Sequence, residues 1–95
     1  MSPTMVWVDN RCAVQEFTRL ELWYGAYHDS MYANPKVDPG QCEFGIVDWS
    51  NGPTWWPTNG GAQTAAPGVY DGPGHHEQAY VHDLVTDTWA YGPEN

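Results

Sequence analysis

RCAVQEFTRLELWY, residues 11–24, decides the fold class, because this stretch fits two different secondary structures. From Ala13 onward, apolar residues recur at spacings of three and four, which places them on one stripe of a helix. Leu20 and Leu22 also alternate with their neighbours, as they would in a strand. We expect a helix near 11–24, with Gly25 as its left-handed terminator, and keep the strand as the alternative.

The rest of the chain favours β structure. The 10 glycines and 8 prolines interrupt helices, while the 6 tryptophans and 6 tyrosines suit half-buried pleated surfaces. Residues 5–8 and 43–49 have the pattern of strands, and residues 79–92 that of a hairpin with its turn near 85–87. Both faces of 43–49 are apolar, so this strand should be covered on both sides. We therefore predict a mainly β domain, a small sandwich or partly open barrel, which becomes α+β if 11–24 is helical.

The length of 95 residues predicts a single small domain over 1–95. Residues 50–74 form a Gly/Pro/Trp-rich stretch, longer than connections in compact domains normally run. We predict a long loop at about 50–74, either ordered and functional or an arm. The N-terminal residues lack the pattern of a signal peptide, and no apolar run is long enough to span a membrane. We expect a cytoplasmic protein or a component of an assembled particle.

Cysteine usage adds little to this picture. Cys12 and Cys42 match no zinc-ligand spacing. Without a signal peptide, the expected compartment is a reducing one, in which thiols stay reduced. We expect two buried free thiols, with a single disulfide between them as the alternative.

The charge is strongly acidic: 12 Asp and Glu against 3 Lys and Arg give a net charge of -9. Direct binding to nucleic acid or to an anionic membrane is excluded, because both rely on basic residues. Residues 67–95 carry no base, and their five acids predict an acidic surface: Asp71, Glu77, Asp83, Asp87 and Glu94. Such a surface either mimics nucleic-acid phosphates for a basic partner or keeps the domain soluble.

Aromatic residues are the candidate partner-binding groups. Trp55 and Trp56 lie between Pro53 and Pro57, so an extended backbone should point the two indoles to opposite sides. Large rigid rings dominate binding hot spots, and indoles also stack on sugars. The predicted partner-binding residues are Trp49, Trp55, Trp56 and Tyr70. For a sugar, Asn51, Asn59 and Asp71 would supply hydrogen bonds to hydroxyls.

Catalytic motifs are absent from the sequence, including the nucleophile elbow, the P-loop and the H-E-x-x-H metalloprotease motif. His75, His76 and Glu77 are the weak metal-ligand candidates, but histidines in glycine-rich acidic loops are usually solvated. We therefore expect no metal, no cofactor and no enzymatic activity.

The expected function is non-enzymatic protein binding, by an accessory, structural or inhibitory subunit of a virion or other assembly. The partner is another protein, including one that itself binds nucleic acid, or a second copy of this chain. Two alternatives stay open: an acidic nucleic-acid-mimicking inhibitor and a carbohydrate-binding module.

Overall fold

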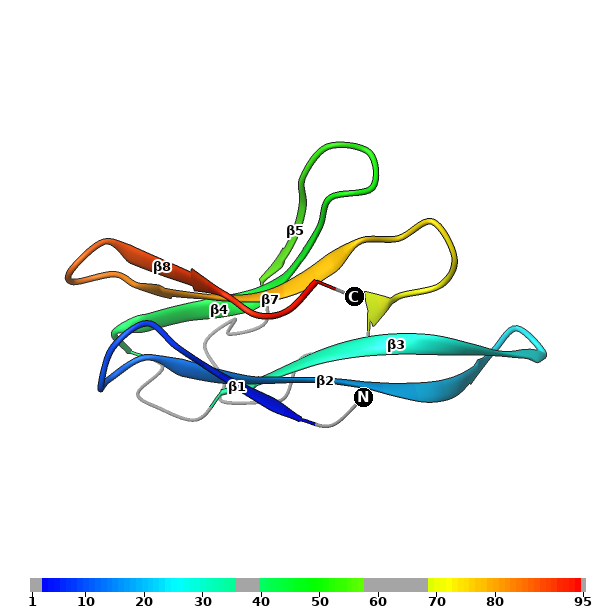
Figure 1. Ribbon diagram of the computed structural model, residues 1–95, viewed down its shortest axis with the longest axis horizontal. Coiled ribbons are helices and arrows are strands. Elements are labelled where there is room, and N and C mark those ends of the chain that lie inside the picture. The colour runs from blue at the N-terminus through cyan, green and yellow to red at the C-terminus, as the bar shows by residue number, and fades with distance from the viewer. Residues whose placement is uncertain (1–2, 36–39, 58–68, 95) are drawn as a thin grey trace.

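The computed structural model describes residues 3–35, 40–57 and 69–94, which fold as two four-stranded antiparallel sheets packed face to face (Figure 1). The first sheet has the order β1 (Thr4–Trp7), β2 (Ala13–Trp23), β3 (Ala26–Pro35) and β6 (Val69–Tyr70). The second has the order β5 (Thr54–Pro57), β4 (Cys42–Asp48), β7 (Glu77–Asp83) and β8 (Thr88–Tyr91). The prediction of a mainly β sandwich is confirmed.

The helix predicted near 11–24 is wrong, because this stretch forms β2. β2 pairs with β1 on one side and, over ten residue pairs, with β3 on the other. These ladders with distant residues outweigh the local preference for a helix. Tyr24 and Gly25 have φ angles of 49° and 83°, as the two central residues of a tight hairpin turn require. Gly25 is left-handed as predicted, but it turns a hairpin and ends no helix.

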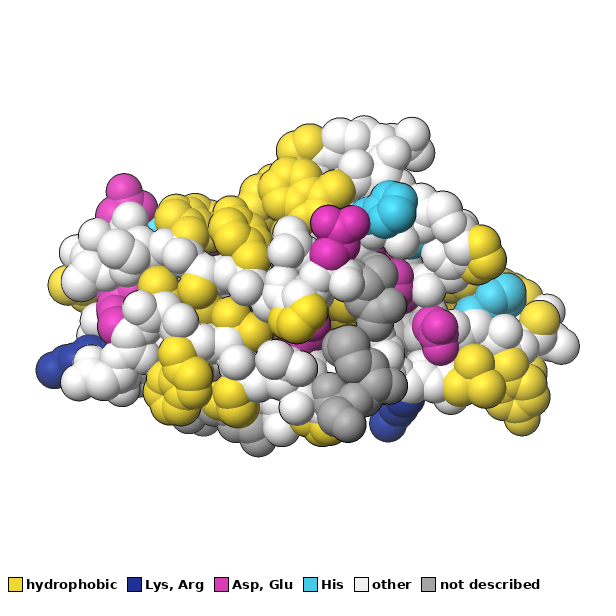
Figure 2. Space-filling model, in the orientation of Figure 1, with side chains coloured by type: hydrophobic (Ala, Val, Ile, Leu, Met, Phe, Trp, Pro, Cys, Tyr) yellow, Lys and Arg dark blue, Asp and Glu magenta, His cyan; other side chains and the backbone are white. Residues whose placement is uncertain are grey.

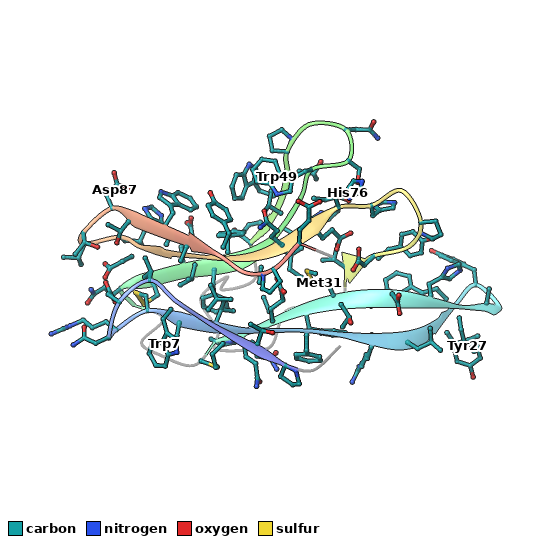
Figure 3. All side chains as sticks on the ribbon, in the orientation of Figure 1. Trp7, Tyr27, Met31, Trp49, His76 and Asp87 are labelled. Atoms are coloured by element: carbon teal, nitrogen blue, oxygen red, sulfur yellow. A yellow bond between two sulfur atoms is a disulfide. The ribbon has the colours of Figure 1, made fainter. Side chains whose placement is uncertain are left out.

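The core lies between the two sheets and is built from alternating strand residues. Its buried members come from both layers: Val6, Val14, Met31 and Ala33 from the first sheet, and Phe44, Ile46, Ala79 and Val81 from the second. Figure 3 shows Met31 pointing from β3 into the space between the layers. The strands predicted at 5–8 and 43–49 and the hairpin at 79–92 are confirmed by β1, β4 and the β7–β8 pair.

Two segments of the predicted long loop at 50–74 are strands. β5 adds an edge strand beside β4, and β6 pairs with β3 at Ser30 and Met31. Residues 58–68 lie outside the described part of the chain. The loop prediction therefore missed two short pieces of sheet, one in each layer.

The two sheets are joined by a disulfide between Cys12 and Cys42, so the expectation of two free thiols is wrong. Cys12 lies directly before β2, and Cys42 is the first residue of β4. The stacking of the sheets brings their Cα atoms to 5.5 Å, within the range of a disulfide. Sequence spacing alone cannot show this proximity.

The β2–β3 hairpin extends beyond the second sheet, on the right of Figure 1. This projecting part carries exposed apolar side chains, among them Leu20, Leu22 and Tyr27. Within the described residues, no helix is long and apolar enough to cross a membrane.

Candidate functional site

The outer face of the second sheet carries a continuous group of aromatic rings. The β7–β8 register places Tyr80 opposite Tyr91 and His82 opposite Trp89. Residues directly opposite each other in antiparallel strands share a face, and residues two apart along a strand share it too. β5 adds Trp55, and Trp49 follows the end of β4. We call this surface the aromatic face, defined by Trp49, Trp55, Tyr80, His82, Trp89 and Tyr91.

The rings of the aromatic face touch one another, with Trp55 at the centre. The Trp55 ring lies 5.0 Å from Tyr80 and 5.8 Å from both Trp49 and Trp89 between centroids. Trp89 in turn stacks flat on His82 at 3.8 Å. Such contacts stabilise each ring in a fixed position beyond simple burial. The rings therefore form one contiguous packed surface.

The aromatic face is open to solvent although its rings are large and apolar. Trp49, Trp55, Trp89 and Tyr91 keep between 38% and 43% of their surface exposed. Figure 2 shows hydrophobic side chains gathered along the upper border of the molecule, over β5 and β8. Contiguous exposed apolar patches on small soluble domains mark interaction sites.

Gly45 makes room for this arrangement. A Cβ at Gly45 would lie 2.3 Å from the carbonyl oxygen of Trp56, 2.9 Å from the Pro57 Cα and 2.9 Å from the Tyr80 hydroxyl oxygen. Two of these contacts are backbone atoms of β5, which cannot move aside without moving the strand. The missing side chain lets β5 and the Tyr80 ring approach β4, which brings Trp55 onto the face.

Hydrogen bonds fix two of the rings at their edges. The Trp49 Nε1 donates to the Gln78 Oε1 at 2.9 Å, and the Gln78 Nε2 donates to the carbonyl of Gly92. His82 lies between two carboxylates, with Nε2 2.8 Å from Asp87 Oδ1 and Nδ1 3.7 Å from Glu43 Oε1. The imidazole under Trp89 therefore has acidic groups on both sides.

Tyr80 and His82 are the buried members of the face, and Tyr80 is the more deeply buried of the two. Burial, followed by the charge of Glu43, raises the pKa of Tyr80 to about 12. Its phenol is therefore neutral at physiological pH and serves as a packing surface for Trp55.

The four predicted partner-binding residues separate in space. Trp49 and Trp55 both lie on the aromatic face, where the label in Figure 3 marks Trp49. Trp56 is exposed but points to the other side of β5, as the extended backbone predicts. Tyr70 lies in the first sheet, against the rings of His28 and His75.

Sequence reasoning missed Tyr80, His82, Trp89 and Tyr91. The signal was present: each pair of rings sits two residues apart on one side of the predicted turn. A hairpin centred there brings these pairs together across the strands.

The predicted acidic surface is mostly buried, which corrects that expectation. Asp71, Glu77 and Asp83 are buried, so they cannot present carboxylates to a partner, while Asp87 and Glu94 are exposed. The two described arginines, Arg11 and Arg19, belong to the first sheet or its loops. In Figure 2 the visible arginine side chains lie at the left end and at the bottom of the molecule, away from the aromatic face.

A second cluster joins the ends of β4 and β7. The register places Asp48 opposite Glu77, and the loop before β7 adds His75. His75 Nδ1 lies 2.7 Å from Asp48 Oδ2 and 3.6 Å from Glu77 Oε2. Two of the three weak metal candidates thus come together with Asp48, which sequence reasoning missed. His76 turns away and pairs with Glu94 at 3.2 Å.

The carboxyl groups of this cluster differ in their acidity. Burial, followed by the charges of Asp71 and Asp48, raises the pKa of Glu77 to about 9. Burial and the charge of Asp29 raise the pKa of Asp71 to about 6. Burial also acts to raise the pKa of Asp48, but hydrogen bonds from Ser50 and His75 outweigh it and lower that pKa. Asp48 therefore carries the negative charge beside His75.

The cluster is not arranged for nucleophilic catalysis. The Ser50 hydroxyl donates to Asp48 at 2.5 Å, and Asp48 also faces His75. A serine nucleophile needs the histidine as its direct hydrogen-bond partner. Here the carboxylate stands between the two groups.

A cleft of about 410 Å³ opens beside His75. Its walls come from the projecting β2–β3 hairpin and from the loop before β7: Leu20, Tyr27, His28, Asp29, Asp71, Gly72, Pro73, Gly74 and His75. The cleft gives solvent a route to one edge of the Asp48–His75–Glu77 cluster.

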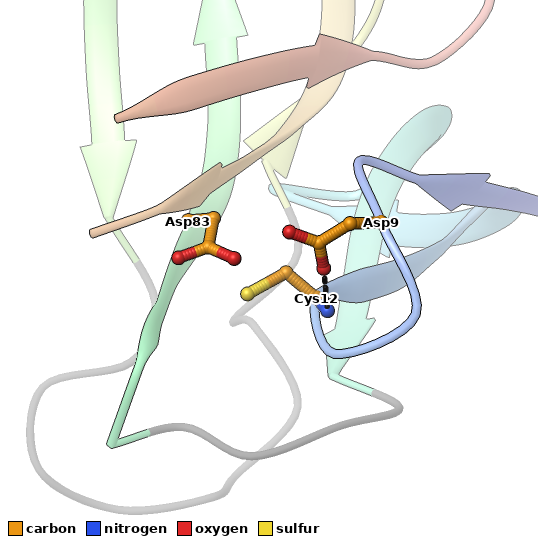
Figure 4. A group of neighbouring side chains, drawn as sticks. All are labelled: Asp9, Cys12 and Asp83. Carbon is orange, nitrogen blue, oxygen red and sulfur yellow. Dashed lines mark hydrogen bonds between the residues drawn. The ribbon is translucent and has the colours of Figure 1, made fainter. Parts of the chain in front are cut away.

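Asp9, Cys12 and Asp83 form a third group of possible metal ligands (Figure 4). The donor atoms of Asp9 and Cys12 are already engaged in other bonds. The Cys12 sulfur is held in the disulfide, and Asp9 Oδ1 accepts the N–H of Cys12 at 2.9 Å. A hydrogen bond from Asp9, with others from Gln41 and from backbone N–H groups, lowers the pKa of Asp83. These residues tie loops together at one end of the sandwich.

The fold and its surface thus define a small antiparallel sandwich with a solvent-exposed aromatic face. No family model, curated protein or solved structure matches the chain. The functional argument therefore rests on the geometry of this chain.

Proposed function

We propose that this protein is a non-enzymatic recognition module that docks through its aromatic face onto a basic surface of another protein. The observation that carries the proposal is the contiguous, half-exposed set of rings on the outer side of the second sheet. Exposed carboxylates border these rings, and the described arginines lie in the first sheet (Arg19) and in the loop between β1 and β2 (Arg11).

Burial of these rings supplies the binding energy in this proposal. Tryptophan and tyrosine cover a large area with few rotatable bonds, so docking costs little side-chain entropy. The ring contacts and the Gln78 hydrogen bond already hold the side chains in place. A surface that is fixed before binding loses less freedom when the complex forms.

The charge around the rings favours a basic partner. Glu43 and Asp87 lie beside His82, on which Trp89 stacks, and the whole chain has a net charge of -9. Indole faces attract arginine and lysine cations, and nearby carboxylates strengthen that preference. The partner surface should therefore combine arginine or lysine with apolar groups.

The two alternative functions have weaker support. For a sugar ligand, three residues were predicted to bind hydroxyl groups. Asp71 is buried, and Asn59 lies outside the described residues. Asn51 is exposed. For a nucleic-acid mimic, the burial of Asp71, Glu77 and Asp83 removes three of the five predicted carboxylates.

Selection of peptides from a random display library on the disulfide-intact protein tests the proposal. We expect enriched peptides that pair arginine or lysine with apolar residues. Trp55→Ser and Trp89→Ser should each weaken binding at least tenfold, since truncated hot-spot residues commonly cost about 2 kcal/mol or more. Trp56→Ser is the matched control, because this indole is exposed but lies outside the aromatic face.

A charge variant tests the proposal without removing an aromatic ring from the sheet. Asp87→Asn removes an exposed carboxylate and should reduce affinity for the selected peptide most strongly at low salt. Selection of peptides without basic residues, or equal losses for Trp56→Ser and Trp89→Ser, would refute the proposal. A glycan that binds through Trp89 while no peptide does would favour the carbohydrate-binding alternative.

A further inference from the structure

We infer that Asp48, His75 and Glu77 form a binding site for a divalent transition-metal cation of the zinc type. The three side chains each offer one donor atom, and these atoms all lie within 4.8 Å of one another. The site lies at the ends of β4 and β7, behind the aromatic face, and it involves none of the rings of that face.

The main argument comes from the buried Glu77 carboxyl group. Its side chain is 0% exposed, and no described donor group lies within hydrogen-bond distance of either oxygen, so the ionised carboxylate is unsatisfied. The protonated acid does find a partner, the Asp48 carboxylate. A buried polar group without a partner is costly and uncommon in folded proteins. Glu77 Oε2 lies 3.6 Å from His75 Nδ1, too far for a hydrogen bond but suitable for two ligands of one cation.

The surrounding charge gives a second, independent argument. Asp71 is buried on the same side, and its Oδ2 also has no hydrogen-bond partner. Neither described arginine forms an ion pair with Asp48, Asp71 or Glu77. A bound divalent cation would favour the ionised forms of Asp48 and Glu77 and balance their charge.

The donor set and its geometry fit zinc better than calcium or magnesium. Donor atoms at about 2.1 Å from a tetrahedral zinc lie about 3.4 Å from one another. The observed 2.7 Å and 3.6 Å distances from His75 Nδ1 bracket that value. Imidazole is a ligand of zinc and its neighbours, whereas calcium and magnesium take oxygen ligands. The cleft beside His75 gives water or another ligand access to a remaining coordination position.

Titration of the chelator-treated, disulfide-intact protein with ZnCl2 tests the inference. Calorimetry should show one zinc ion per chain. At a hundredfold excess over the dissociation constant, the melting temperature should rise by about 10 °C or more. His75→Ala and Asp48→Asn should each abolish this rise. His76→Ala should keep it, because that adjacent histidine is exposed and pairs with Glu94.

A measurement on the wild-type chain covers the case in which a variant fails to fold. X-ray absorption of the zinc complex should show one imidazole together with oxygen ligands. Absence of calorimetric binding, a stronger response to CaCl2 than to ZnCl2, or a loss in His76→Ala equal to that in His75→Ala would each overturn the inference.

Discussion

Removal of the Cys12–Cys42 disulfide should destabilise the protein severely. The cross-link joins residues 30 apart in sequence and ties the start of β2 to the start of β4. The chain-entropy relation for a loop of this length gives about 3.6 kcal/mol at 25 °C. A domain of this size has a total free energy of unfolding of roughly 5–14 kcal/mol, so the loss is a large fraction.

Urea unfolding followed by tryptophan fluorescence measures the effect. We compare the oxidised wild type with the Cys12→Ala/Cys42→Ala double variant, and with the wild type in reductant as a control. With an m-value of roughly 1.5 kcal/mol per molar, the urea midpoint should fall by about 2.5 M, both in the double variant and in the reduced wild type. A midpoint change below about 0.5 M, or two reactive thiols in the native oxidised protein, would refute this reasoning.

Two further predictions concern the packing of the sandwich. Burial raises the pKa of Glu16 from 4.5 to about 7, so the folded state holds the proton more tightly than the unfolded state, and this stability is lost as the pH rises through about 7. The Glu16→Gln variant should lack this pH-dependent loss of stability, which amounts to up to about 3 kcal/mol. Its melting temperature should therefore fall less between pH 5 and pH 8 than that of the wild type. An equal fall in both proteins would contradict the raised pKa of Glu16. Gly45→Val should displace β5, lower the free energy of unfolding by about 1–3 kcal/mol in urea titrations and weaken peptide binding at Trp55. Wild-type stability and affinity in that variant would show that Gly45 does not shape the aromatic face.

The β class and most of the strands follow from the sequence, but the identity of residues 11–24 does not. Their spacing satisfies the helical and the extended pattern at once, because Leu20 lies on the helical stripe that starts at Ala13 and also alternates with Leu22 as in a strand. The deciding partner is β3, which pairs with β2 through a two-residue turn at Tyr24 and Gly25. Gly25 predicted a left-handed backbone at this position, but left-handed glycines occur both at helix ends and in hairpin turns, so Gly25 could not decide between the two.

The candidate sites depend on contacts between distant residues. Trp55 was found as a local feature between two prolines, whereas Trp89 joins it only through the pairing of β5, β4, β7 and β8. His75 and Glu77 were found as neighbours in sequence. Asp48 completes their cluster through the β4–β7 register, which composition and local spacing do not reveal.

The tryptophan indole N–H signals of the labelled protein test the central proposal most directly. The chain has 6 tryptophans, and three of them, Trp49, Trp55 and Trp89, lie on the aromatic face. Titration with the selected basic peptide should shift or broaden these three signals and leave those of Trp7, Trp23 and Trp56 in place. Shifts confined to Trp7, Trp23 or Trp56 would show that binding occurs elsewhere and would contradict the docking role of the aromatic face.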